Sequence, residues 1–275
     1  MAEELTFSSE WAASLESRLP PPASSTSHSD QSHGSSSRPF VTLTFATSLD
    51  SGLSLAPGVR TRLSGPDSKA MTHYLRSRHD AILIGIGTML ADDPALNCRL
   101  TGGPTPPRPI LIDPSLRWRP RREDKVLEVQ RNGKGFAPLV LCAAAVEDVP
   151  KEYRHVLEEH GGKYVSCPST SSGAQGSRKF AWADILQALH REKLRSVMVE
   201  GGAQIINSLL HPSNHSLVDS IIVTIAPVWL GQGSVTVSPE RVQDENGTAL
   251  PVARLSDVSW HPFGEDVVLC GGLRG

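Results

Sequence analysis

Apolar residues in this chain recur at two spacings, one typical of strands and one typical of helices. Residues 197–199 form a short apolar run of the buried-strand type, closed by Glu200 and then by Gly201 and Gly202. Apolar side chains follow at helical spacing, at Ile205, Ile206, Leu209 and Leu210. The pattern predicts a strand, a tight turn and an amphipathic helix in direct succession.

The same alternation continues along most of the chain. Apolar runs rich in β-branched residues predict further strands at residues 39–46, 80–87, 108–113, 138–144, 163–167, 218–226, 254–261 and 266–270. Helical spacing predicts helices at residues 66–75, 153–159 and 182–192, with one helical turn at 88–92. Strands and helices alternate through the middle of the chain, and its end is rich in strands. This order predicts a three-layer α/β fold with a mostly parallel central sheet and antiparallel strands at the C-terminal end.

Residues 38–275 are therefore expected to form one domain, without a second core or a repeat. Residues 1–37 differ in composition, because 20–37 are dominated by Pro, Ser and other small polar residues. Such a stretch buries too little apolar surface to offset its ordering entropy, so we expect a flexible N-terminal tail with one short helix at 5–19. Two polar stretches, residues 116–135 and 169–179, are expected to be an exposed excursion and a loop.

Composition narrows the function only slightly. The 275 residues are 39% hydrophobic and 20% charged, with a net charge of −2, which gives no sign of attraction to nucleic acid or membrane. The four cysteines are scattered singly, without the C-x-x-C spacing of a metal site, so we expect ordinary thiols and no metal. The first residues are acidic and do not show the basic and then apolar pattern of a secretory signal. A reducing, cytoplasmic location is expected.

Two glycine-containing turns carry the candidate chemistry. Gly201 and Gly202, between a strand and a helix, would offer bare backbone N–H groups to an anion, although a helix that simply needs a tight turn explains them equally well. Residues 85–87 are Gly-x-Gly after a buried strand, but the third glycine of a dinucleotide fingerprint is absent. Thr88 and Asp92 would share one face of the following helical turn, and a capping role for Asp92 or Asp93 is the alternative.

Seven short motifs, taken together and in order, resemble a known family. They are Phe-Ala-Thr-Ser-Leu-Asp at 45–50, Leu-Ser-Gly-Pro-Asp at 63–67, Met-Thr-His-Tyr-Leu-Arg at 71–76, Ala-Ile-Leu-Ile-Gly-Ile-Gly-Thr at 81–88, Ala-Asp-Asp-Pro-Ala-Leu-Asn-Cys-Arg at 91–99, Val-Glu-Gly-Gly-Ala at 199–203 and Ile-Ala-Pro-Val-Trp-Leu-Gly-Gln-Gly at 225–233. The set resembles the riboflavin-biosynthesis pyrimidine reductases, in their stand-alone fungal form. The resemblance spans about residues 39–272.

The resemblance implies a dihydrofolate-reductase-like fold, a homodimer and NADPH as cofactor, with NADH as the other choice. It also implies a reaction, in which the ribosylamino side chain of 2,5-diamino-6-ribosylamino-4(3H)-pyrimidinone 5′-phosphate is reduced to ribitylamino. Bacterial relatives often carry a zinc deaminase domain. Its His-x-Glu and Pro-Cys-x-x-Cys signature is absent here, so we expect no deaminase activity.

Site residues follow from the resemblance only where motifs match. The implied cofactor contacts are Thr88, Asp92, Val165, Gly201, Gly202, Ala203, Gln204 and Ile205. Glu200 would face the substrate and, with Asp50, is a candidate catalytic carboxylate, although Asp50 also fits an ordinary turn. Arg99 is the candidate for the substrate phosphate, because a guanidinium binds phosphate through two hydrogen bonds.

Three questions stay open on the sequence. Ser51 and Gly52 replace the Gly-Lys that often follows the Leu-Asp in bacterial members, so no lysine contact is expected there. No sequence motif marks an arginine that would bind a cofactor 2′-phosphate, and Arg60, Arg62 and Arg108 are only candidates. Another pterin or pyrimidine reductase on the same fold, or a nucleotide-binding homologue without activity, would also fit.

Overall fold

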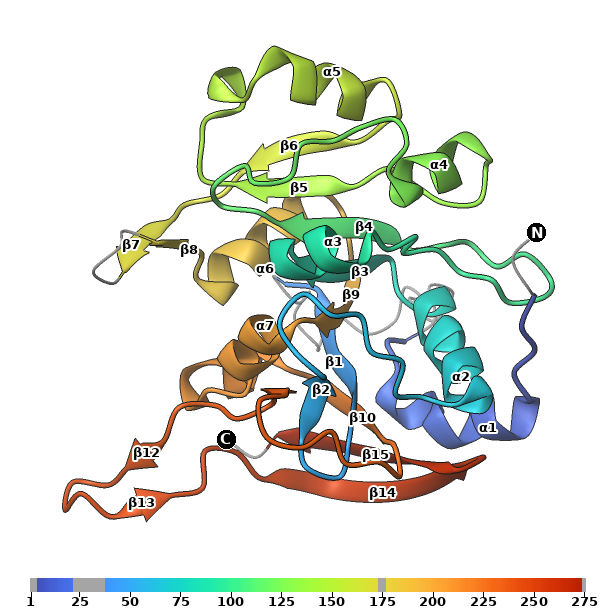
Figure 1. Cartoon of the computed structure of the whole chain (residues 1–275), viewed down its shortest axis with the longest axis vertical. Coiled ribbons are helices and arrows are strands. Elements are labelled where there is room, and N and C mark those ends of the chain that lie inside the picture. The colour runs from blue at the N-terminus through green and yellow to red at the C-terminus, as the bar shows by residue number, and fades with distance from the viewer. Residues whose placement is uncertain (1–3, 22–37, 173–176, 274–275) are drawn as a thin grey trace, which may run out of the picture.

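A nine-stranded sheet forms the centre of the molecule (Figure 1). The computed structural model describes residues 4–21, 38–172 and 177–273. The strand order is β14-β15-β10-β1-β9-β3-β4-β5-β6. The strands span Phe40–Thr47 (β1), Ala81–Gly85 (β3), Arg108–Ile112 (β4), Leu139–Cys142 (β5), Lys163–Ser166 (β6), Ser196–Gly201 (β9), Ser220–Ile225 (β10), Leu255–Phe263 (β14) and Asp266–Leu273 (β15).

Strands β10, β1, β9, β3, β4, β5 and β6 run parallel, and the last two strands of the chain join antiparallel beside β10. The predicted mostly parallel sheet with an antiparallel C-terminal end is therefore confirmed. Parallel strands place their carboxyl ends on one edge, and ligands of open α/β sheets bind outside that edge. Here the edge is formed by the residues that end β9, β3, β4, β5 and β6.

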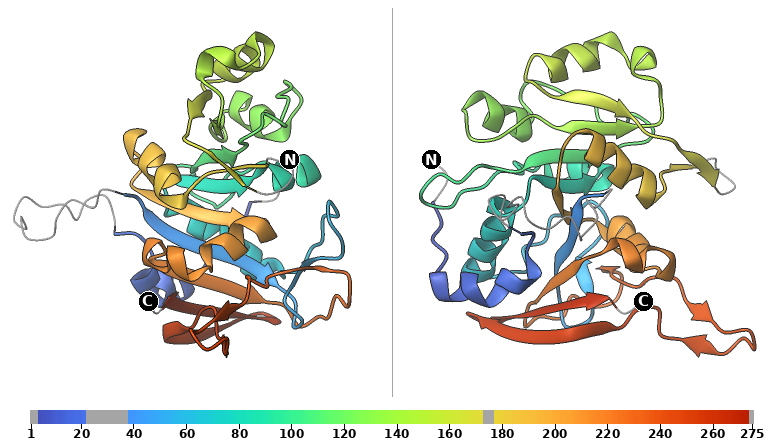
Figure 2. Two further views of the ribbon diagram at one scale, coloured as in Figure 1. Left: turned by 90° about the vertical axis from the view of Figure 1, so that its left-hand side faces the viewer. Right: turned by 180° about the vertical axis from the view of Figure 1, so that it is seen from behind.

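Helices cover both faces of the sheet (Figure 2). Alternate residues of β3 point to opposite faces, so Leu83 belongs to one core cluster and Ile82 to another. One face is covered by α6 (Trp182–Arg191) and α7 (Ala203–Leu209). The other is covered by α1 (Ser9–Leu15), α2 (Pro66–Ser77), α3 (Ile86–Asp92), α4 (Lys125–Arg131) and α5 (Lys151–Glu158). None of the described helices is long and apolar enough to cross a membrane.

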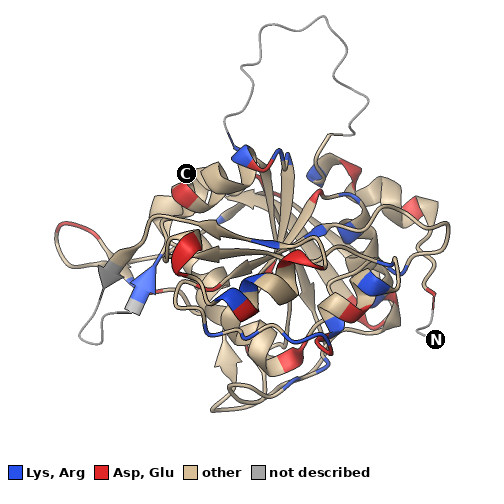
Figure 3. Ribbon diagram, turned by 90° about the horizontal axis from the view of Figure 1, so that it is seen from above, with Lys and Arg blue, Asp and Glu red and all other residues tan. Residues whose placement is uncertain are grey.

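Short elements complete the fold. The 3-10 turns are η1 (Glu16–Arg18), η3 (Val146–Asp148) and η4 (Pro212–Leu217). Three two-stranded ribbons pair β2 (Gly52–Ser54) with β11 (Val235–Thr236), β7 (Thr170–Ser172) with β8 (Ser177–Lys179), and β12 (Val242–Gln243) with β13 (Ala249–Leu250). Basic and acidic residues are interspersed over the face seen in Figure 3, in keeping with the small net charge.

The start of the chain packs on the body. The short helix expected at 5–19 is present as α1 and η1, and Leu15 is fully buried in a cluster with residues of α2, β14 and β15. Residues 4–20 are called the N-terminal arm below. Residues 22–37 of the expected flexible tail lie outside the described residues.

Two expectations for polar stretches were wrong. Residues 116–135 are not simply an exposed excursion, because they contain α4, whose Val126 and Leu127 are fully buried. Trp118 is also buried and donates its indole N–H to the Asp124 carboxylate. The basic residues between these apolar positions obscured the pattern. Residues 169–179 contain the paired strands β7 and β8 rather than a plain loop.

Candidate active site

Glu200 stands at an irregularity in the sheet. Strand β9 pairs with β3 through Leu83 and Val199, and then through Ile84 and Gly201, so the register skips Glu200. Such a bulge inserts one unpaired residue and re-aims its side chain. The Glu200 carboxylate lines a cavity between the sheet and α2.

Arg76 of α2 holds that carboxylate from the other side of the cavity. Its Nε donates to Oε1 of Glu200 at 2.7 Å and its Nη2 donates to Oε2 at 2.6 Å. Its third nitrogen, Nη1, donates to the carbonyl of Asn97 at 2.9 Å. Burial is the largest effect and lowers the pKa of Arg76, but the charge and the hydrogen bonds of Glu200 act against it, and the pKa is raised. This two-pronged pair fixes both the position and the rotation of the carboxylate.

The cavity itself is rich in hydroxyl groups. Its volume is about 180 Å³, and it is lined by Thr44, Phe45, Ala46, Ser64, Thr72, Glu200 and Thr224. Four of these residues carry hydroxyls, and they come from two strands, from α2 and from the loop before it. A carboxylate among hydroxyls is a suitable environment for a small polar ligand with several hydrogen-bonding groups.

Sequence reasoning did not single out Arg76 or the four hydroxyl residues as site residues. Arg76 was noted only as part of a motif, and it lies 124 positions from its partner Glu200. One signal was present in the strands. Thr44 and Thr224 are buried polar residues in strands covered on both faces, where a near-continuous apolar run is expected.

The two glycines after Glu200 have backbone angles that favour glycine. Gly201 has φ +62° and Gly202 has φ +97°, a conformation that L side chains rarely adopt. A Cβ at Gly202 would lie 3.0 Å from Oγ1 of Thr88. The Thr88 hydroxyl donates to the carbonyl of Gly201 at 3.3 Å. The structure thus brings together the two glycine-containing turns that the sequence analysis treated separately.

Backbone N–H groups at the start of α7 point out of the helix. The first bond of the helix runs from the N–H of Ile206 to the carbonyl of Gly202 at 3.1 Å. The N–H groups of Ala203, Gln204 and Ile205 precede that bond and have no partner within the helix. These N–H groups and the backbone of Gly201 and Gly202 are called the glycine cradle below, and a Cβ at Gly202 would crowd Thr88 beside it.

The two neighbouring aspartates of α3 have separate roles. Asp93 ends the helix with φ 41° and accepts the backbone N–H of Lys125 at 3.0 Å, so it joins α3 to α4. Asp92 stands one helical turn after Thr88 and shares its face. The capping alternative therefore applies to Asp93, and Asp92 is left beside Thr88.

Asp50 is engaged by two loops. Its carboxylate accepts the hydroxyl of Ser48 at 2.5 Å and the backbone N–H groups of Leu230 and Gly231 at 3.0 and 2.7 Å. These hydrogen bonds, that of Ser48 first, lower the pKa of Asp50 to about 2. The carboxylate thus joins the turn after β1 to residues 227–233, and Asp50 is not among the residues that line the Glu200 cavity.

Arg99 lies against His73 of α2. The backbone N–H of Arg99 donates to Nδ1 of His73 at 3.1 Å, and its guanidinium Nη2 lies 3.1 Å from Nε2. His73 is 3% exposed. Burial, and then the charges of Arg76, Arg99 and Lys69, lower its pKa to about 3. The sequence analysis did not give this histidine a role.

Val165 and Arg108 lie apart from Glu200. Val165 is on the edge strand β6, four strand spacings or about 19 Å from β9, at the same carboxyl edge. Arg108 begins β4, so it lies at the opposite edge and donates to the carbonyls of Ala137 and Gly161. Its candidacy for the cofactor 2′-phosphate stays a prediction. Arg60 and Arg62 are exposed in the loop before α2.

Comparison with known proteins identifies the family. The family model described as RibD C-terminal domain matches residues 39–269. The chain belongs to this family. It is 42% identical over 245 residues to the 2,5-diamino-6-ribosylamino-4(3H)-pyrimidinone 5′-phosphate reductase of Debaryomyces hansenii, covering 86% of this chain and 91% of that one. The protein of the same name from Saccharomyces cerevisiae is 42% identical over 241 residues, covering 86% and 87%.

Solved structures agree with this assignment. The riboflavin biosynthesis reductase Rib7 of Saccharomyces cerevisiae superposes with a TM-score of 0.72 at 34% identity, covering 96% of this chain and all of that one. RibD of Acinetobacter baumannii superposes with a TM-score of 0.65 at 22% identity, covering 87% of this chain and 59% of that one, and shows the same fold. The resemblance found in the seven motifs and the expected fold class are both confirmed.

Proposed function

We propose that the chain reduces the ribosylamino side chain of 2,5-diamino-6-ribosylamino-4(3H)-pyrimidinone 5′-phosphate to ribitylamino, with NADPH as the reductant. The relatives that cover most of the chain carry the name of this reductase. The observation that carries the proposal is the Glu200 cavity. It places a carboxylate, fixed by Arg76, among four hydroxyl residues and directly before the glycine cradle.

The cradle fits a dinucleotide phosphate. Gly201 and Gly202 stand where a Cβ would crowd Ile206 and Thr88, and the N–H groups of residues 203–205 supply donors for an anion. We assign the pyrophosphate of NADPH to this cradle, with Thr88 and Asp92 beside it. Val165 then marks the far end of the cofactor along the carboxyl edge. When bound, the nicotinamide supplies the hydride, and the protein supplies position and electrostatics.

Glu200 acts on the substrate carbon that is reduced. The open-chain imine of the ribosylamino group carries positive charge when protonated, and a fixed carboxylate stabilises that charge before transfer. Arg76 keeps Glu200 from turning towards other donors. The hydroxyls of Thr44, Ser64, Thr72 and Thr224 offer partners for the polar groups of the substrate, and burial between α2 and the sheet excludes bulk water.

We assign Asp50 a positioning role and Arg99 the substrate phosphate. Both carboxylate oxygens of Asp50 already accept hydrogen bonds from residues 48, 230 and 231, so this residue shapes the loop that follows β10. Arg99 reaches His73, which lies one helical turn before Arg76 on α2. Helix α2 therefore supports both proposed substrate contacts, Glu200 through Arg76 and Arg99 through His73.

We also propose a cytoplasmic homodimer. The four cysteines are free thiols, as in reducing compartments. The edge strand β14 exposes Val258 and Trp260, which are 44% and 58% accessible, and β15 exposes Val267 beside them. An apolar surface on an edge strand is typically covered by a partner. Light scattering should give the mass of two chains, and Trp260→Arg should shift it to one.

The test of the function is direct. Purified protein, NADPH and the ribosylaminopyrimidine phosphate should give oxidation of NADPH and a ribityl product identified by mass spectrometry. Binding of NADPH without turnover by intact protein would instead support the nucleotide-binding homologue. Turnover of a dihydropterin but not of the pyrimidine would support another reductase on the same fold.

A further inference from the structure

The N-terminal arm is hydrogen-bonded to the segment that carries Arg99. Leu5 forms a parallel bridge with Leu100. The N–H of Leu5 donates to the carbonyl of Arg99 at 2.9 Å, and the N–H of Thr101 donates to the carbonyl of Leu5 at 2.9 Å. The arm is thus attached to the residues immediately on both sides of position 100.

Both backbone polar groups of Arg99 are engaged by different elements. Its N–H is bound by His73 of α2, and its carbonyl is bound by Leu5 of the arm. The preceding residue, Cys98, also donates its thiol to the carbonyl of His73 at 3.2 Å. The backbone at Arg99 is therefore held between the arm and α2, and only the side chain is left to act on a ligand.

The guanidinium of Arg99 has a side-chain neighbour, His73. Its Nη2 lies 3.1 Å from Nε2 of the ring. Among the described residues, no carboxylate lies within ion-pair distance of Arg99. A guanidinium without a carboxylate partner suits an anion such as a phosphate.

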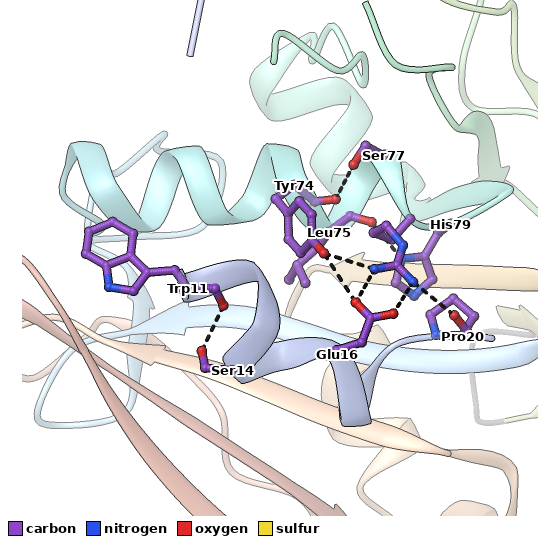
Figure 4. A network of polar contacts seen from close by, with 9 residues as sticks. Trp11, Ser14, Glu16, Pro20, Tyr74, Leu75, Ser77 and His79 are labelled. Carbon is purple, nitrogen blue, oxygen red and sulfur yellow. Dashed lines mark hydrogen bonds and ion pairs between the residues drawn. The ribbon is translucent and has the colours of Figure 1, made fainter. Parts of the chain in front are cut away.

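The arm is anchored firmly enough to act as a support. The Phe7 ring stacks on Tyr74 at 4.9 Å, and Trp11 packs against Phe263 at 4.7 Å. Further along the arm, Glu16 accepts two hydrogen bonds from Arg78, at 2.5 and 2.8 Å (Figure 4). Tyr74 and Arg78 belong to α2 or its C-cap, so the arm grips the same helix that carries His73 and Arg76.

We propose that the N-terminal arm is part of the substrate-phosphate subsite, where the Leu5–Leu100 bridge positions Arg99 to bind the phosphate. The inference rests on the proposed function for the identity of the substrate. It adds a positioning residue, Leu5, from a segment outside the family match at 39–269. His73 is the second support, through the hydrogen bond that its Nδ1 accepts from the backbone N–H of Arg99.

The bridge can be broken from the body of the protein without removing a buried side chain. Thr101 is exposed, and Thr101→Pro removes the N–H that donates to Leu5. Thr105→Pro is the matched control, because Thr105 is exposed in the same loop and its N–H donates no hydrogen bond among the described residues. Leu5→Pro removes the other bond of the bridge from the side of the arm.

The KM values for the phosphorylated and the dephosphorylated pyrimidine distinguish positioning from general damage. Thr101→Pro and Leu5→Pro should raise KM for the phosphorylated substrate about tenfold or more, as expected for loss of a charged hydrogen bond. The dissociation constant for NADPH and kcat/KM for the dephosphorylated substrate should stay within about twofold of wild type. The Thr105→Pro control should leave all of these values unchanged.

A direct titration keeps this test separate from the proposed function. Ribose 5-phosphate binding, measured by calorimetry with Arg99→Ala as reference, needs no turnover. Weaker binding in both bridge variants but not in the control supports the arm even if the wild type proves inactive on the pyrimidine. Unchanged binding in the bridge variants, or an equal loss for phosphorylated and dephosphorylated substrate, overturns the proposal. If the Leu5→Pro protein does not fold, the ribose 5-phosphate affinity and the KM values of Thr101→Pro alone test the proposal.

Discussion

At the scale of single residues, the Glu200 carboxylate is fixed by two independent features. The register skip in β9 aims the side chain out of the sheet, and the two bonds from Arg76 hold it at 2.6 and 2.7 Å. The two features come from different elements, because the bulge belongs to a strand and the guanidinium to a helix 124 positions away. Under the proposed function, the carboxylate would need no rearrangement to face a bound substrate.

Asp50 offers a test at the same scale, through acid stability. Its pKa of about 2 in the folded protein lies below the usual 3.8, so its contribution to stability is present above pH 3.8 and is lost as pH falls towards 2. Asp50→Asn should lower the melting temperature at pH 7 and lower it progressively less as pH falls through this window. Calorimetric scans at several pH values check this.

The same variant reports on catalysis. If Asp50 only shapes residues 227–233, Asp50→Asn should change kcat far less than Glu200→Gln does. A loss of kcat equal to that of Glu200→Gln, in protein of unchanged melting temperature, would restore Asp50 as a catalytic carboxylate.

At the scale of elements, the strand-turn-helix unit β9–Gly-Gly–α7 and the unit β3–α3 meet at one point. Thr88 at the start of α3 touches the carbonyl of Gly201, and Gly202 is too close to Thr88 for a side chain. Two glycine turns that each looked weak in the sequence become a single cradle, because β9 and β3 are neighbours in the sheet.

Gly202→Ala should therefore affect both folding and cofactor binding. Its backbone lies at φ +97° and ψ 146°, which costs a non-glycine residue about 1–3 kcal/mol. The new Cβ also crowds Thr88 and the cradle, so the dissociation constant for NADPH should rise by about tenfold or more, as for a lost charged hydrogen bond. Denaturant unfolding and fluorescence titration measure the two effects.

Gly133→Ala is the control for this pair of effects. Gly133 has φ +67° and no atom near the position of a Cβ, and it lies at the end of α4 away from the cradle. It should lose stability but keep the NADPH affinity of wild type. Unchanged affinity in Gly202→Ala as well would remove the cofactor phosphate from the glycine turn.

Elements with a strong apolar period were predictable from the sequence, whereas those hidden by charge were not. The strands of the sheet and the antiparallel end were anticipated, because a buried strand needs an uninterrupted apolar run. Helix α4 was missed, because Val126 and Leu127 stand alone among charged residues. The side chains that meet at Glu200 were only partly anticipated. A local motif marks a glutamate before two glycines, but no local pattern shows that Arg76 and Thr224 come to lie beside it.

At the scale of the whole molecule, the site is assembled from segments across the chain. The Glu200 cavity is lined by residues of β1, α2, β9 and β10, and the glycine cradle adds α3 and α7. The N-terminal arm, which composition marked as separate from the domain, packs on α2 and reaches the residue proposed to bind phosphate. Helix α2 connects these parts, since it contacts the arm through Tyr74, Arg99 through His73 and Glu200 through Arg76.

The central claim is that Glu200 acts on the reacting sugar while the next two residues hold the cofactor. It is tested most directly by the rate of NADPH oxidation in Glu200→Gln, measured beside the dissociation constant for NADPH. Glutamine keeps the shape of the side chain and removes its charge, so kcat should fall by about 10²-fold or more, the size of one electrostatic contact to the transition state. The NADPH dissociation constant should stay within about twofold. A wild-type rate, or an equal loss of rate and of cofactor affinity, would contradict the account.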